Sequence, residues 1–75
     1  MSPKIPVLTS RVVIQALERA GFVIHRQSGS HVILKRESDK RRVTVPFHNR
    51  DLRKGTLRSI LREASLSIEQ LVELL

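Results

Sequence analysis

The sequence predicts a small α+β domain in which helices cover one face of a three-stranded antiparallel sheet. The 75 residues are enough for one domain with a single core. Apolar residues recur at helical spacing near both ends of the chain, whereas the middle holds short β-branched runs separated by turn residues. The predicted order is therefore helix, three strands, helix and a short final helix, α-β-β-β-α(-α), within a single domain over residues 1–75.

The first helix is expected over residues 11–20, after an irregular arm over residues 1–8 that contains two prolines. Thr9 or Ser10 supplies a hydroxyl that can cap the first turn. Gly21 ends the helix, because glycine adopts the left-handed conformation most easily. The buried face is one apolar stripe, formed by Val13, Ala16, Leu17 and Ala20.

Three strands are expected at residues 22–26, 31–36 and 42–45. Turn chemistry around Gly29 separates the first two strands, and a polar connection separates the second from the third. Pro46 ends the third strand because proline cannot donate to a ladder. Alternation places Val32, Leu34, Val43 and Val45 on the covered face, and His31, Ile33 and Lys35 on the open face. Of these, the apolar Ile33 fits an open face poorly.

The second helix is expected from Gly55 or Thr56 to Ala64, and Ser65-Leu66 interrupts it. Its buried side chains are Leu57, Ile60, Leu61 and Ala64. Ser67 and Gln70 have the spacing of a capping box, which predicts the start of a short C-terminal helix.

The charge balance points to an anionic partner. Lys and Arg total 14 against 7 Asp and Glu, which gives a net charge of +7. A small domain this basic usually binds a polyanion, although a solvated charged surface is the alternative. Without cysteine the chain has no disulfide framework, thiolate metal site or thiol nucleophile, which fits a reducing compartment. No segment has the pattern of a signal peptide or a membrane span, so we expect a soluble cytoplasmic protein and no membrane partner.

The segment Ser28-Gly29-Ser30-His31 is the strongest candidate for chemistry. A turn before a strand holds the base of a side chain rigid and leaves its tip open to solvent. Histidine is the side chain whose ordinary pKa suits proton transfer near neutral pH. From composition alone, however, a lone histidine beside a turn is more often structural than catalytic.

The other two histidines have different expected roles. His25 lies within a strand, where a solvated or packed side chain is the simpler interpretation. His48 follows the exit of the third strand, where it either orients the loop or provides a second proton-transfer group. The histidines lack the short spacing of metal ligands and no acidic cluster accompanies them, so neither a metal nor a cofactor is expected.

Basic residues fall into two groups that are candidates for binding a nucleic acid. Lys54, Arg58 and Arg62 repeat every four residues and form one stripe on the second helix, with Arg50 and Arg53 leading into it. The other group surrounds the connection between the second and third strands and consists of Lys35, Arg36, Lys40, Arg41 and Arg42. Either group can follow a phosphate backbone. The only aromatic residues are Phe22 and Phe47, so little base stacking is expected.

Several blocks of the sequence together resemble the HicA toxin family. They are Gly21-Phe22, Ser28-Gly29-Ser30-His31, Val45-Pro46-Phe47-His48, Lys54-Gly55-Thr56-Leu57, Ile60-Leu61 and Leu66-Ser67, in the family's order and at similar spacing. The resemblance implies a fold like that of double-stranded-RNA-binding domains, mRNA interferase activity and neutralisation by a HicB-type antitoxin. It also implies that His31 is the catalytic residue. The chain departs from the family at Val32-Ile33-Leu34, where an aromatic residue is frequent, and at Ser65, where glycine is common.

Three classes of function follow from these observations. The leading one is a toxin that cleaves mRNA as a metal-independent endoribonuclease, with His31 as general acid and base for attack by the 2′-hydroxyl. The second is a noncatalytic RNA-binding module, which leaves the placement of the histidine unexplained. The third is an interaction protein whose basic surface binds an acidic partner. An acidic antitoxin is the partner expected under the first class.

Overall fold

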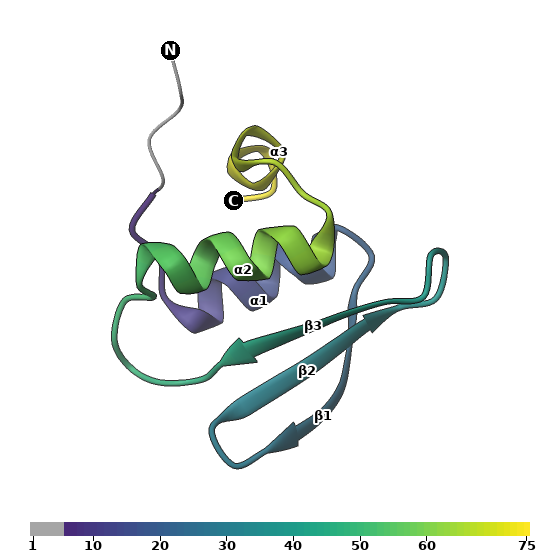
Figure 1. Ribbon diagram of the computed structural model, residues 1–75, viewed down its shortest axis with the longest axis horizontal. Coiled ribbons are helices and arrows are strands. Elements are labelled where there is room, and N and C mark those ends of the chain that lie inside the picture. The colour runs from purple at the N-terminus through teal and green to yellow at the C-terminus, as the bar shows by residue number, and fades with distance from the viewer. Residues whose placement is uncertain (1–5) are drawn as a thin grey trace.

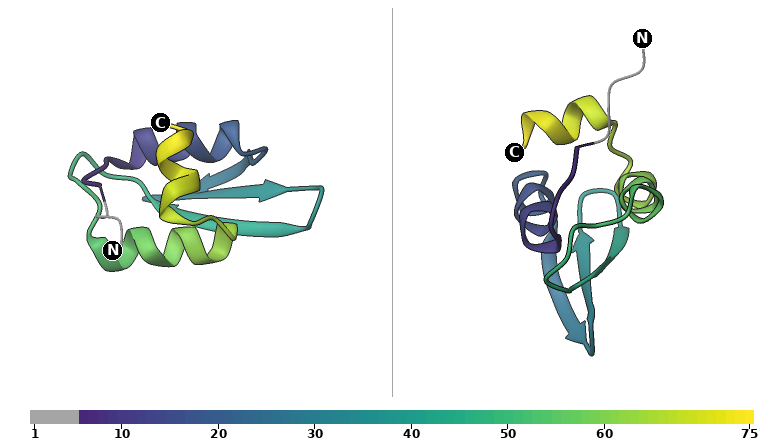
Figure 2. Two further views of the ribbon diagram at one scale, coloured as in Figure 1. Left: turned by 90° about the horizontal axis from the view of Figure 1, so that it is seen from above. Right: turned by 90° about the vertical axis from the view of Figure 1, so that its left-hand side faces the viewer.

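The computed structural model describes residues 6–75 and has the predicted α+β architecture (Figure 1). Three antiparallel strands form a sheet in the order β1-β2-β3. Helices α1 and α2 lie side by side on one face of this sheet, and α3 crosses them on the side away from the sheet (Figure 2). The elements are α1 (Ser10–Arg19), β1 (Val23–Ser28), β2 (His31–Arg36), β3 (Arg41–Pro46), α2 (Lys54–Ala64) and α3 (Ile68–Glu73).

The ends of the helices follow the predicted capping chemistry. Thr9 caps α1, and its hydroxyl accepts a hydrogen bond from the amide of Val12 at 3.4 Å. Gly21 has a φ of +97° just after this helix, as predicted for the residue that ends it. Of the predicted irregular arm, residues 6–8 are neither helix nor strand, and residues 1–5 lie outside the described residues.

Nearby residues also determine where α2 ends and where α3 begins. Ser65 ends α2 in the left-handed conformation, with a φ of +57°, which glycine adopts most easily. The capping box is present, because the amide of Gln70 donates to the hydroxyl of Ser67 and the amide of Ser67 donates to the side chain of Gln70. Among residues 6–75, no helix is long and apolar enough to cross a membrane.

The first strand differs most from its predicted boundaries. It begins one residue after Phe22, which is 2% exposed and belongs to the core, and it extends two residues beyond Arg26. Because Ser28 pairs with His31, the hairpin loop contains only Gly29 and Ser30. The short loop is feasible because Gly29 has a φ of +57°, as the tight turns of antiparallel hairpins require. The register shifts between Ile24 and Arg26, so the ladder bulges at this point.

The predicted facing of the sheet is correct. Val32, Leu34, Val43 and Val45 are buried beneath the helices in one cluster with the apolar faces of α1, α2 and α3. Ile33 has the opposite orientation by register, yet it is 7% exposed. Arg26 and Thr44 lie directly across from it on the two neighbouring strands and share its face, so their side chains flank it.

A single side chain, that of Arg36, joins the sheet to the ends of both long helices. Its guanidinium donates to the carbonyl of Ala20 at 2.9 Å and to the carbonyl of Ala64 at 3.4 Å. These carbonyls lie at the C-terminal ends of α1 and α2, where a positive charge also interacts favourably with the helix dipole. The same group lies 4.5 Å from the centre of the Phe22 ring, in a cation–π arrangement.

Asp39 completes this arrangement from the β2–β3 turn. Its carboxylate accepts two hydrogen bonds from Arg36, at 3.1 and 2.7 Å. Hydrogen bonding to Arg36 is the main reason why the pKa of Asp39 falls from 3.8 to about 2, and the same contact raises the pKa of Arg36. Arg36 was predicted to bind RNA; in the structure its guanidinium is engaged within the fold.

Candidate functional site

His31 is the first residue of the central strand. Across the hairpin it pairs with Ser28, and on the other side it pairs with Pro46 at the end of β3. The side chain is exposed, although the backbone that carries it lies between two strands. This combination matches the expectation of an imidazole with a fixed base and an accessible tip.

The turn before His31 is connected directly to the segment after β3. The carbonyl of Ser30 accepts a hydrogen bond from the amide of Phe47 at 2.6 Å. Ser28, Gly29 and Ser30 themselves are exposed, and an ideal Cβ added to Gly29 would meet no atom within 4 Å. The supporting turn is therefore fixed by its backbone, and glycine is needed there for its conformation rather than for space.

Ser10 fixes the other side of the same segment. This serine is 0% exposed, and its hydroxyl donates to the carbonyl of Pro46 at 2.5 Å. The same oxygen accepts from the amide of His48 at 3.4 Å. Ser10 therefore ties the start of α1 to the exit of β3. The sequence indicated only a capping role, because a serine before a helix looks the same whether it caps the helix or reaches a distant strand.

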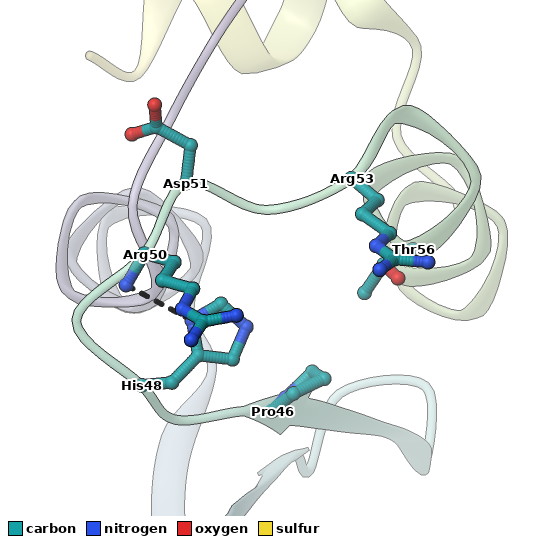
Figure 3. Close-up of a pocket in the computed structure, with 6 residues that line it drawn as sticks. All are labelled: Pro46, His48, Arg50, Asp51, Arg53 and Thr56. Atoms are coloured by element: carbon teal, nitrogen blue, oxygen red, sulfur yellow. Dashed lines mark hydrogen bonds between the residues drawn. The ribbon is translucent and has the colours of Figure 1, made fainter.

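His48 lies on the loop after β3, where its Nδ1 accepts a hydrogen bond from the amide of Arg50 at 3.2 Å. Because Nδ1 accepts, the proton of the neutral ring is on Nε2. This bond lies within the loop after β3, and both predicted roles of His48 stay predictions. His48 also lines a hollow of about 500 Å³, together with Pro46, Arg50, Asp51, Arg53 and Thr56 (Figure 3).

The three histidines do not form one cluster. His31 and His48 lie near the same end of β3, because Pro46 at that end pairs with His31 and precedes His48 by two residues. His25, by contrast, is exposed and lies at the bulge of the edge strand β1. Within residues 6–75, no group of three or more histidine, aspartate or glutamate side chains is arranged to hold a metal ion.

The two predicted basic groups differ in how their charges are paired. Lys54, Arg58 and Arg62 are exposed along α2. At the β2–β3 turn, by contrast, Arg36 and Arg41 contact Asp39 at 2.7 and 3.3 Å, and Lys40 contacts Glu37 at 2.6 Å. The turn group is thus partly neutralised, whereas Lys35 from the same group lies half-buried on β2.

Arg50 and Arg53 were predicted only to lead into the helical stripe. In the structure both line the hollow beside His48: Arg50 lies over the His48 ring on the loop, and Arg53 lies at the start of α2 beside Thr56, whereas the carboxylate of Asp51 points away (Figure 3). The sequence signal was a run of basic residues around Asp51 at the start of a helix. It did not reveal the hollow, because the shape of the loop depends on the hydrogen bonds made by Ser10 and His48.

A comparison of the chain with known protein families gives a match. A comparison with curated proteins gives no match. The family model described as the HicA toxin of bacterial toxin–antitoxin systems matches residues 10–66, which is more than half of the chain. This range contains α1, the whole sheet, the loop with His48 and α2. The chain therefore belongs to the HicA toxin family of bacterial toxin–antitoxin systems.

Proposed function

We propose that this toxin is an endoribonuclease that cleaves mRNA without a metal ion, with His31 as its catalytic residue. The observation that supports this most directly is the placement of His31: an exposed imidazole on the first residue of the central strand, in the motif that the HicA resemblance assigns to catalysis. A rigid backbone under an accessible imidazole is what general acid–base catalysis requires.

RNA carries its own nucleophile, so the protein has three tasks. The imidazole of His31 takes the proton from the 2′-hydroxyl as the O2′–P bond forms. Exposed cations stabilise the negative charge that builds up on the phosphoryl oxygens. The P–O5′ bond then breaks, and the leaving oxygen receives a proton from the imidazolium or from water. The products are a 2′,3′-cyclic phosphate and a 5′-hydroxyl.

The proposed RNA surface consists of Lys35, Lys54, Arg58 and Arg62, which are not among the ion-paired residues of the β2–β3 turn. We propose that the antitoxin is an acidic, HicB-type protein that covers His31 and part of this surface. Opposite charge speeds such an encounter and matches a surface suited to RNA. The site of action of the toxin is then the cytoplasm, where mRNA is available.

Cleavage is expected to continue in excess EDTA. The 2′-hydroxyl supplies the nucleophile, and the sequence has neither cysteine nor an acidic cluster to hold a divalent ion. The measurement compares cleavage of an RNA oligonucleotide with that of the matching 2′-deoxy strand, each with and without EDTA. Loss of RNA cleavage in EDTA, or cleavage of the deoxy strand, would contradict the mechanism.

RNA affinity is expected to depend steeply on salt concentration, with Lys54, Arg58 and Arg62 carrying part of that dependence. Each phosphate contact on a single strand contributes about −0.7 to the log–log slope, so replacing all three residues by glutamine flattens the slope by about two units. Binding is measured in the His31→Ala background, which leaves the RNA intact. Lys40→Gln is the control, because this lysine is paired with Glu37. An unchanged slope in the triple variant would place the RNA elsewhere.

A further inference from the structure

The hollow between the loop after β3 and the start of α2 is lined by groups that can bind an anion. It measures about 500 Å³ and is lined by Pro46, His48, Arg50, Asp51, Arg53 and Thr56 (Figure 3). Its walls come from two segments that are fixed independently. The loop is held by Ser10 and by its own His48 contact, and the opposite wall belongs to α2.

The charges around this hollow are unbalanced. Arg50, beside His48 on the loop, and Arg53, beside Thr56 at the start of α2, line its two walls, and the one acidic residue in its lining, Asp51, directs its carboxylate away. Neither arginine is among the ion pairs formed within residues 6–75, where the acidic partners are Glu37 and Asp39. Two guanidinium groups without a carboxylate partner favour occupation by an anion.

The hydrogen-bonding groups of the lining suit a phosphate in particular. Each arginine presents a fork of N–H donors, which matches two oxygens of one phosphate. The Nδ1 atom of His48 accepts from the amide of Arg50, so Nε2 carries the proton of the neutral ring and acts as a donor. The hydroxyl of Thr56 can add a further donor.

The hollow and the proposed catalytic residue, His31, share a neighbour, Pro46. Pro46 forms part of its lining and is also the register partner of His31 on the neighbouring strand. Residues directly opposite in an antiparallel pair have Cα atoms about 5 Å apart. Pro46 therefore lies beside both His31 and the hollow, so we expect one RNA strand to reach both.

We propose that this hollow is a phosphate subsite, which holds the phosphodiester next to the one that is cleaved. The proposal rests on the proposed ribonuclease function and adds to it a recognition element: the substrate is a strand with a phosphate flanking the cleaved linkage. Contacts to this neighbouring phosphate position the ribose at His31, so their binding energy appears in kcat/KM.

The first test is direct binding of inorganic phosphate to the intact chain, followed by NMR of the His48 ring and the Arg50 and Arg53 amides. We expect saturable shifts at these groups. Arg50→Gln and Arg53→Gln should each weaken binding by about tenfold, the effect of losing a charged hydrogen bond. Lys40→Gln, which removes one charge at the distant β2–β3 turn, should leave binding unchanged. Equal effects of all three substitutions would overturn the proposal, because they would indicate only a general attraction of charge.

The second test distinguishes an RNA phosphodiester from free phosphate as the natural occupant. The substrates carry a single ribose: a dinucleotide with one phosphodiester, and two trinucleotides extended by one deoxynucleotide on the 5′ or the 3′ side. One extension should raise kcat/KM by about tenfold in the wild type and in Lys40→Gln. Arg50→Gln and Arg53→Gln should lose most of this gain. A gain that persists in both arginine variants, or no gain from either extension, would overturn the assignment.

The two tests also separate this inference from the proposed function. If phosphate binding depends on Arg50 and Arg53 but no ribose-containing strand is cut, the subsite stands as an anion site and the ribonuclease proposal fails. If His31-dependent cleavage occurs without phosphate binding in the hollow, the ribonuclease proposal stands and the subsite is wrong.

Discussion

His31→Ala is expected to abolish growth arrest and to slow RNA cleavage by about 10²- to 10⁴-fold, the usual contribution of one general acid–base group. The fold should persist. The side chain is exposed at the end of its strand, and removing it opens no cavity in the core, so the loss of stability is about 1 kcal/mol or less. Induced expression, cleavage of a defined RNA and thermal unfolding measure the three effects.

His25→Ala is the matched control for this experiment. It makes the same substitution at an exposed histidine on the edge strand and should leave toxicity and cleavage unchanged. Cleavage at the wild-type rate by His31→Ala would refute the catalytic assignment. If the variant unfolds while the control remains folded, His31 has a structural role. If the variant still binds RNA but the wild type does not cut it, the chain is a noncatalytic RNA-binding module.

Arg36→Met is expected to lower the free energy of unfolding by about 2–4 kcal/mol. Methionine keeps the apolar part of the arginine side chain, so this loss comes from the guanidinium. The substitution removes the donors to the carbonyls of Ala20 and Ala64 and the cation over the Phe22 ring. Urea unfolding measures the change. Lys40→Met is the control, because the Lys40–Glu37 pair is exposed and its loss should cost less than about 0.5 kcal/mol. Equal changes in the two variants would show that Arg36 does not join the helices to the sheet.

Lowering the pH should reduce the difference in the free energy of unfolding between the wild type and Arg36→Met. The pKa of Asp39 is about 2 in the folded chain, below the ordinary value of 3.8, so the stabilising contribution of the ionised carboxylate is present above pH 4. As the pH falls through about 2, Asp39 becomes protonated and that contribution disappears. The difference in stability between wild type and Arg36→Met should therefore narrow over this range.

The sequence predicted those features that depend on neighbouring residues. The Ser67–Gln70 capping box, the end of α1 at Gly21 and the placement of His31 at the start of β2 each follow from a few adjacent residues, and the structure has all three. The faces of β2 and β3 that the helices cover were also predictable. Side chains alternate between the two faces of a strand, and only one of the two sets is apolar enough to be buried.

The features that the sequence did not predict depend on contacts between distant segments. Arg36 lies 16 residues from Ala20 and 28 from Ala64, so its basic side chain looked like part of an RNA surface. Ser10 bonds to Pro46, 36 residues away, and looked like a helix cap. The hollow beside His48 likewise forms only when the loop is folded. The sequence therefore revealed that Arg50 and Arg53 are charged, but not that they line a hollow.

The central position of β2 has a consequence for how such a toxin can be controlled. A strand paired on both sides is among the last parts of a small domain to open, because local fluctuations release edges and termini first. In the proposed mechanism the catalytic imidazole of His31 is carried on that strand, so we expect its geometry to persist for as long as the chain is folded. On that proposal, partial melting or a loosened loop does not lower the activity. Restraint then comes from outside the domain, either as a protein that covers the imidazole or as destruction of the whole chain.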